Sequence, residues 1–210
     1  AAKNFFDLYS NEGRVLDVGS LDVNGSLLSV TPKECEYVGA DLTAGDGVDV
    51  VLNDPHELPF ANAEFDVVVS TSCFEHTQFF WLTFLECLRV LKDGGLLYLN
   101  APSNGPYHPY PQDNWRFYPD SGLSLKAWGK RNGYEVELME SFILNQMDGV
   151  WNDYVAIFSA GERNNPAAWL HSKFPAASNI WGKSETRIQR ESGRPEDQRK
   201  TRAWKRVFGL

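Results

Sequence analysis

One stretch of the sequence decides the fold class: Arg14-Val15-Leu16-Asp17-Val18-Gly19-Ser20-Leu21-Asp22-Val23-Asn24-Gly25-Ser26. A short apolar run, typical of a buried strand, leads directly into a turn that contains two glycines. Such a turn lets a ligand approach the backbone closely, because glycine has no side chain to clash. Gly19 and Gly25 are six residues apart, however, which is not the G-x-G-x-x-G spacing of a dinucleotide site. Alone, the turn also fits an ordinary strand–helix connection.

Apolar runs and helical stretches alternate along the rest of the first 160 residues. Strands are predicted near residues 14–18, 36–40, 48–51, 65–69 and 96–99, followed by a pair at 134–142 and 153–159. Leucines at helical spacing predict a helix over 79–91, ended by a glycine cap within 92–95, and a second helix is expected from 120 or 121 to 131. This order predicts a doubly wound, mostly parallel α/β sheet, whose ligands bind at the carboxyl ends of the strands.

Three acidic residues follow successive predicted strands. Asp17 ends the first strand, Asp41 ends the second, and Asp54 comes just after the third. A carboxylate at the end of the second strand can accept hydrogen bonds from ribose hydroxyls, and one beyond the third can accept from an exocyclic amine. Each could instead be a turn former or a helix cap. Their common position favours one ligand site at this edge.

Charge and composition restrict the class of protein further. The 210 residues carry a net charge of −8, but residues 161–210 hold 11 basic and 5 acidic groups and the first 160 hold 9 and 23. An acidic body argues against a nucleic-acid partner. No apolar run is long enough to span a membrane, and the three scattered cysteines suggest free thiols in a reducing cytoplasm.

The two parts of the chain also differ in pattern. We expect residues 1–160 to form the main domain and residues 161–210, which lack a clear strand pattern, to form a basic extension. The extension would pack on the body or on a partner subunit, which would give a homodimer. Aromatic side chains are the expected anchors, namely Trp169, Trp181, Trp204 and Phe208.

Several motifs together resemble class I S-adenosylmethionine-dependent methyltransferases over roughly residues 10–160. The closest likeness is to a bacterial subgroup whose first glycine loop reads G-S-L-x-V-N-G-S. The motifs are V-L-D-V-G at 15–19, the glycine loop at 19–26, Asp41, D-x-x-x-L-P-F at 54–60, F-D-V-V-V-S at 65–70, E-H at 75–76 and L-R-V-L-K-x-G-G at 88–95.

The resemblance implies a Rossmann-like fold with a seven-stranded sheet and a C-terminal antiparallel hairpin. It also implies that S-adenosylmethionine binds and leaves as S-adenosylhomocysteine. Asp17 and Gly19 would hold the methionine end, Asp41 the ribose, and Asp54 with its neighbours the adenine, above a floor of Ser70 and Thr71. The full implied cofactor set is Asp17, Gly19, Ser20, Asp41, Leu42, Asp54, Pro55, His56, Ser70 and Thr71. The loop departs from the family pattern in lacking the second glycine of G-x-G-x-G.

A long connection at residues 101–120 follows the fifth strand and is the expected acceptor site. Loops of this length in a compact domain are usually functional. The residues expected to bind the acceptor are Tyr107, Asp113, Trp115 and Arg116. The alternative is structural: Trp115 and Phe117 would cap the core, and Arg116 would pair with a nearby carboxylate.

Four histidines compete for the role of catalytic base. His171 is expected at the surface and His56 beside the cofactor, which leaves His76 and His108 as candidates. The sequence does not choose between them. A metal ion bound by His108 and Asp113 is an alternative, but no metal site is predicted, because no acidic pair clusters there.

The sequence therefore predicts an enzyme that methylates an oxygen of a small polar acceptor, such as a sugar or a related metabolite. An N-methyltransferase of a small amine and a non-catalytic S-adenosylmethionine-binding module remain alternatives. A nicotinamide dehydrogenase is disfavoured by the glycine spacing.

Overall fold

The computed structural model describes residues 1–10, 12–23, 25–145, 150–183 and 186–187, and within them a single mixed sheet forms the centre of the fold. Its nine strands lie in the order β3-β2-β1-β4-β5-β7-β6-β8-β9. Their bounds are β1 Gly13–Val18, β2 Cys35–Asp41, β3 Val50–Val51, β4 Phe65–Thr71, β5 Leu91–Pro102, β6 Val136–Asn145, β7 Asn152–Ala160, β8 Ala177–Gly182 and β9 Thr186–Arg187.

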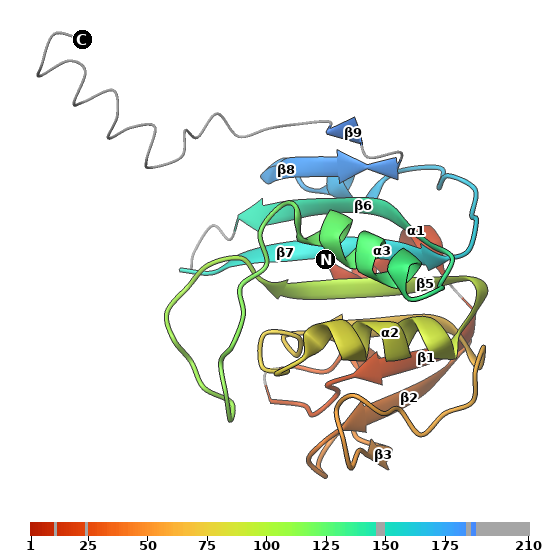
Figure 1. The fold of residues 1–210 in the computed structure, drawn as a ribbon, viewed down its shortest axis with the longest axis vertical. Coiled ribbons are helices and arrows are strands. Elements are labelled where there is room, and N and C mark those ends of the chain that lie inside the picture. Colours follow the sequence, from red (N-terminus) through yellow and green to blue (C-terminus); the bar gives the residue numbers. More distant parts are fainter. Residues whose placement is uncertain (11, 24, 146–149, 184–185, 188–210) are drawn as a thin grey trace, which may run out of the picture.

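Strands β1 to β5 are all parallel, and β7 pairs antiparallel with both β5 and β6. These seven strands are the predicted sheet with its C-terminal hairpin, so the predicted fold class is confirmed. Helices α2 (Phe80–Val90) and α3 (Ser121–Arg131) cover one face, and α1 (Ala2–Tyr9) covers the other (Figure 1). Each face has its own buried apolar cluster, as expected for a parallel sheet buried on both sides.

The connection after β1 contains no α-helix in the residues described between β1 and β2. A short 3₁₀ turn, Leu27–Ser29, lies there instead. The Ser26 hydroxyl caps this turn by accepting a hydrogen bond from the Leu28 amide. Asp22 Oδ1 accepts from the Gly25 amide at 2.8 Å, which folds the loop on itself before it reaches the turn. Such local side-chain hydrogen bonds compete with helix formation.

The predicted glycine cap of the first long helix is wrong. Helix α2 ends at Val90, and Leu91 is already extended and pairs with Phe65. Leu91 is buried, so its place in the core outweighs the local glycine signal. Gly94, at φ +73°, instead lies in an irregular stretch where the register between β4 and β5 shifts.

The extension also contains strands that the sequence pattern did not predict. β8 pairs antiparallel with β6, and β9 pairs with β8. Asn179 has a φ of +51°, which interrupts the alternation of side chains and hides the strand from pattern analysis. Trp169 and Trp181 both pack against the buried clusters, and Trp181 Nε1 donates to Asp120 Oδ1 at 3.0 Å. Trp204 and Phe208 lie outside the described residues.

A buried carboxylate joins the extension to the body. Glu140 on β6 is completely buried and accepts hydrogen bonds from the Tyr9 hydroxyl, from the Leu170 and His171 amides and from His171 Nδ1. The expectation that His171 lies at the surface is wrong, because this contact leaves its side chain only 15% exposed. Leu170, with no exposed surface, fills the core beside this cluster.

No helix among the described residues has both the length and the apolar character needed to cross a membrane.

We expect Glu140→Ala to lower the free energy of unfolding by about 3 kcal/mol or more, because it leaves several buried donors without an acceptor. Denaturant unfolding measures the effect. The control is Glu36→Ala, which removes an exposed carboxylate beside Arg14 and should change stability by less than about 1 kcal/mol. Equal effects of the two substitutions would show that Glu140 does not hold the extension in place.

Candidate active site

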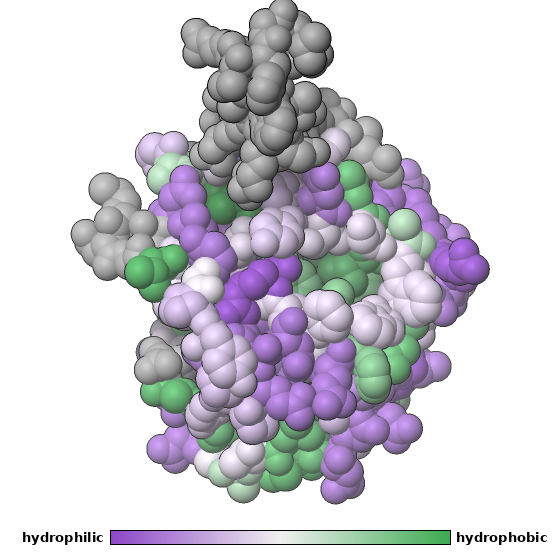
Figure 2. All heavy atoms as spheres, turned by 60° about the vertical axis from the view of Figure 1, so that its left-hand side comes forward, coloured by the Kyte–Doolittle hydropathy of each residue, from purple (hydrophilic) through white to green (hydrophobic). Residues whose placement is uncertain are grey.

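A large cavity opens at the carboxyl edge of β1, β2 and β4. It has a volume of about 890 Å³, which is in the usual range for small-molecule sites. Figure 2 brings this edge forward and shows hydrophilic side chains gathered around a hollow. The lining comes from the glycine loop, the end of β2, residues 55–56, the segment after β4, the loop after β5, and Trp151 and Asp153.

Asp17, the last buried polar residue of β1, forms one end of the cavity. It is 2% exposed, and its Oδ2 accepts a hydrogen bond from the Tyr37 hydroxyl at 2.6 Å. Its Oδ1 is buried and has no partner. Burial raises the pKa of Asp17 to about 7, and the charge of Asp41 adds to the rise. A ligand that donates hydrogen bonds or carries a positive charge would therefore fit beside Oδ1.

The next two residues complete this end. Gly19 has a φ of +87°, and a Cβ atom on it would lie 2.5 Å from Cys73 Cβ, so the turn and its packing both require glycine. Ser20 is 4% exposed and its hydroxyl has no partner, which gives the cavity a second unpaired polar atom. Asp17, Gly19 and Ser20 all line the cavity.

The end of β2 forms the middle of the cavity. Asp41 lines it and accepts from the Leu21 amide at 3.3 Å and the Thr43 amide at 2.9 Å. These bonds hold the glycine loop and the turn after β2 around one carboxylate. Leu42 also lines the cavity and is 50% exposed, as expected for a side chain that covers a bound ring.

The segment after β3 contributes Pro55 and His56 to the lining, but not Asp54. Asp54 is exposed, and its Oδ1 accepts from the His56 amide at 2.7 Å, so it shapes the turn. Thr83 donates its hydroxyl proton to the Pro55 carbonyl, so it accepts from His56 Nδ1 at 3.1 Å. The Nε2 atom of His56 therefore carries the free lone pair.

Of the two floor residues expected at the end of β4, Thr71 lines the cavity and Ser70 does not. Ser70 is fully buried, and its hydroxyl donates to the Val18 carbonyl at 2.8 Å. It thus ties β4 to β1 directly under the glycine turn.

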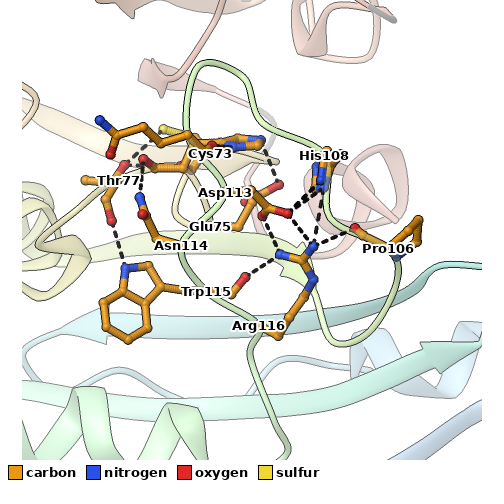
Figure 3. Close-up of polar contacts among 11 residues, drawn as sticks. Cys73, Glu75, Thr77, Pro106, His108, Asp113, Asn114, Trp115 and Arg116 are labelled. Carbon is orange, nitrogen blue, oxygen red and sulfur yellow. Dashed lines mark hydrogen bonds and ion pairs between the residues drawn. The ribbon is translucent and has the colours of Figure 1, made fainter.

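The loop after β5 is held by a buried ion pair. Asp113, with 2% of its side chain exposed, accepts from both Nη atoms of Arg116 at 2.5 and 2.7 Å and from the His108 amide at 2.8 Å (Figure 3). The Arg116 guanidinium holds the pKa of Asp113 well below its usual range. Trp115 Nε1 donates to the Thr77 carbonyl at 3.0 Å. These contacts are those of the structural alternative for Arg116.

None of the four residues expected to bind the acceptor lines the cavity. Tyr107 is 75% exposed, and Asp113, Trp115 and Arg116 make the contacts above. The loop residues that do line the cavity are His108, Pro109, Tyr110, Pro111 and Gln112.

Both candidate bases, His76 and His108, line the cavity, and their rings are in contact. The rings of His76 and His108 are 5.0 Å apart, and His108 also contacts the Trp151 ring at 4.6 Å. His56, the third histidine of the lining, packs against Phe79 instead.

Sequence reasoning missed Glu75 as a site residue, although it noted the E-H pair. Glu75 is 1% exposed, and burial raises the pKa of its carboxyl to about 7. Its Oε2 is buried without a partner, and its Oε1 lies 3.6 Å from His76 Nε2. Trp151 and Asp153, from the hairpin, were also missed, because no local motif marks residues that only the sheet order brings to this edge.

We expect the stability of the ligand-free protein to fall as the pH rises from about 4 to about 7. The unfolded chain ionises Asp17 near its ordinary pKa of 3.8, whereas the folded chain keeps the proton until about 7. The folded state then binds more protons across this window, so stability decreases with pH.

Asp17→Asn should make the stability fall less as the pH rises, because asparagine can still accept a hydrogen bond from Tyr37 but does not ionise. Thermal unfolding at about pH 5 and about pH 8 measures it. Asp46→Asn, in an exposed turn, should leave the pH dependence unchanged. An identical pH dependence in wild type and Asp17→Asn would contradict the assignment.

Comparison with known proteins agrees with the fold. A model of the methyltransferase domain family matches residues 6–99. The rice (Oryza sativa subsp. japonica) chloroplastic 2-methyl-6-phytyl-1,4-hydroquinone methyltransferase 2 is 30% identical over 148 residues, which cover 61% of this chain and 41% of the relative. The chain thus spans less than half the length of this relative.

Two solved structures illustrate the fold likeness. A Burkholderia thailandensis 1,6-didemethyltoxoflavin-N1-methyltransferase, with 1,6-didemethyltoxoflavin and S-adenosylhomocysteine bound, has a TM-score of 0.56 at 13% identity over 77% of this chain and 79% of its own. An S-adenosylmethionine-dependent methyltransferase from Methanosarcina mazei has a TM-score of 0.55 at 14% identity over 76% and 97%. The domain match over residues 6–99 is to methyltransferases, and the solved structures show the same type of fold.

Proposed function

We propose that the chain transfers a methyl group from S-adenosylmethionine to an oxygen of a small polar acceptor, such as a sugar or a related metabolite. One observation carries the proposal. A single cavity joins an unpaired carboxylate oxygen and an unpaired hydroxyl at the end of β1, and the Asp41 carboxylate at the end of β2, to a pair of histidines whose rings are in contact. The first set suits the donor and the second suits an acceptor that must lose a proton.

The donor would lie along the first set of residues. Its methionine ammonium would fit beside Asp17 Oδ1 and the Ser20 hydroxyl, both buried and without partners. Asp41 would accept from the ribose hydroxyls, and Leu42 and His56 would border the adenine. When bound, the donor supplies a methyl group on a positively charged sulfur.

The acceptor would lie in the cavity beside the His76–His108 pair, whose rings are in edge-to-face contact. Either Nε2 atom could accept a hydrogen bond from the reacting hydroxyl and align it, and general-base help of this kind contributes about 10²–10⁴-fold. Asp113 and Arg116 would act indirectly, because they hold the backbone of the loop that carries His108. Trp115 would anchor the same loop through Thr77.

A small amine is the second candidate acceptor. The buried Glu75 carboxylate has an unpartnered oxygen, and Asp153 lines the same cavity. This acidic end would favour a cationic group. A small-molecule acceptor of either kind fits the cavity. We propose no nucleic-acid or membrane partner. Assembly of the chain as a homodimer remains a prediction.

We expect the protein to bind S-adenosylmethionine and S-adenosylhomocysteine at micromolar strength. Asp41→Ala should weaken binding by about 1–3 kcal/mol, the range for a lost hydrogen bond to a charged group. Calorimetric titration measures both. Asp46→Ala, a carboxylate in the same turn region that does not line the cavity, is the matched control. Tighter binding of NAD than of either adenosyl ligand would contradict the proposal.

We expect His108→Ala to slow methyl transfer by about 10²-fold while the affinity for S-adenosylmethionine stays unchanged. The assay incubates the protein with ¹³C-methyl donor and a pool of small polar metabolites. The chemical shift of the transferred carbon then distinguishes oxygen from nitrogen acceptors. If the variant unfolds or loses the donor, the loop is structural and the acceptor binds elsewhere.

A further inference from the structure

Three potential metal ligands converge at the histidine end of the cavity. Glu75, His76 and His108 each offer one ligand atom, and these atoms all lie within 4.8 Å of one another. The best defined pair is His76 Nε2 and Glu75 Oε1, at 3.6 Å. That separation is long for a direct hydrogen bond. It is close to the spacing of two ligands on one ion, since bonds of about 2.0–2.2 Å place ligand atoms about 3–4 Å apart.

Partners behind the two histidines leave their lone pairs free for such an ion. His76 Nδ1 contacts the Gln112 carbonyl, which can only accept, so Nδ1 carries the proton and Nε2 the lone pair. His108 Nδ1 lies 3.2 Å from Asp113 Oδ2 and 3.4 Å from Arg116 Nη2. Arg116 Nη2 uses its two hydrogens on Asp113 Oδ2 at 2.7 Å and on the Pro106 carbonyl at 2.9 Å, so we assign the Nδ1 proton of His108 to the nearer carboxylate (Figure 3). Metal-binding histidines usually have such a carbonyl or carboxylate behind them.

Glu75 gives an independent indication that a ligand belongs here. Its side chain is 1% exposed, it lines the cavity, and its Oε2 has no hydrogen-bond partner. An unpaired carboxylate oxygen removed from water is unfavourable by several kcal/mol. No hydrogen bond joins Arg116 to Glu75: the two Nη atoms of Arg116 bond to Asp113 and to the Trp115 and Pro106 carbonyls, and its buried Nε has no partner.

We propose that Glu75, His76 and His108 bind a divalent first-row transition-metal ion such as Zn²⁺, with open positions that face the cavity. Two imidazoles and one carboxylate are a ligand set for zinc or iron rather than for magnesium. His108, whose side chain is 37% exposed, is the ligand that would move to bring the three atoms from within 4.8 Å of one another to the spacing of ligands on one ion.

The role of this ion in the reaction rests on the proposed function. A hydroxyl oxygen bound to the ion loses its proton more readily, as metal-bound water does. The O–H bond then breaks and the proton leaves to solvent. The oxygen forms a bond to the methyl carbon as the carbon–sulfur bond breaks, and the electron pair stays on sulfur. His76 and His108 would then act as ligands and would not take up the proton.

The test measures metal binding without any methyl donor. The full chain, untagged and freed of metal by a chelator, is titrated calorimetrically with Zn²⁺, and Co²⁺ absorption reports the ligand set. Glu75→Gln, His76→Gln and His108→Gln should each weaken Zn²⁺ binding at least 10-fold. His56→Gln is the matched control, because it removes an imidazole from the same cavity but not from the cluster. This variant should bind Zn²⁺ with wild-type affinity. Thermal unfolding of each variant checks that it is folded.

Equal Zn²⁺ affinity in wild type and in the three cluster variants would overturn the proposed site. If no folded cluster variant can be obtained, the wild type alone decides: a Co²⁺ absorption spectrum that shows no nitrogen ligand would also overturn the proposed site. Methyl transfer at full rate after chelation would overturn the role of the ion in catalysis. Metal binding without any methyl transfer would instead count against the proposed function and leave the metal site standing.

Discussion

The parallel pairing of β1 with β2 on one side and β4 on the other is the constraint on which the site depends. Asp17 pairs in register with Gly39 and with Val69, so the carboxyl ends of the three strands meet at one edge. The Ser70 hydroxyl bonded to the Val18 carbonyl fixes that register at the last residue of the strand. Because of this pairing, the glycine turn, Asp41 and the segment after β4 all open into the same cavity.

The opposite end of the cavity depends on a loop that has no regular secondary structure. The Asp113–Arg116 pair lies at its centre, and the Asp113 carboxylate also accepts the His108 amide. The Asn114 and Trp115 amides both donate to the Glu75 carbonyl, which joins the loop to the segment after β4. The charged pair therefore sets the position of His108 against His76, and the loop can carry a site residue although it has neither helix nor strand.

Local patterns in the sequence were sufficient to predict strands β1 to β7, both long helices and an edge of the sheet lined by Asp17 and Asp41, because these features depend on apolar runs and on residues at strand ends. Local patterns failed where long-range contacts determine the secondary structure. Leu91 continues into a strand because the core buries it, against the local signal of Gly94 and Gly95. β8 is hidden by the left-handed Asn179.

At the histidine end of the cavity, composition singled out the loop after β5 together with His76 and His108, and residues 108–112 of that loop and both of these histidines line the cavity. It could not indicate which way each side chain points. Arg116 and Asp113 looked like ligand-binding groups because both are charged in a long loop, but they bind one another. Glu75 looked like part of a family motif, and only its burial and unpaired oxygen mark it as a site residue.

Two buried carboxylates, Asp17 and Glu75, lie in one cavity, and each has an oxygen without a partner. Folding removes both from water, and neither has a basic side chain bonded to the free oxygen. Such groups persist where a bound ligand supplies the missing charge or donor. Asp17 faces the glycine turn, where a ligand's ammonium group would compensate it, whereas Glu75 faces two imidazole lone pairs. Imidazole lone pairs accept and do not donate, so they cannot satisfy the ionised Glu75 carboxylate. A cation shared by all three groups satisfies the carboxylate and both imidazoles at once, which is why the two ends of the cavity require different ligands.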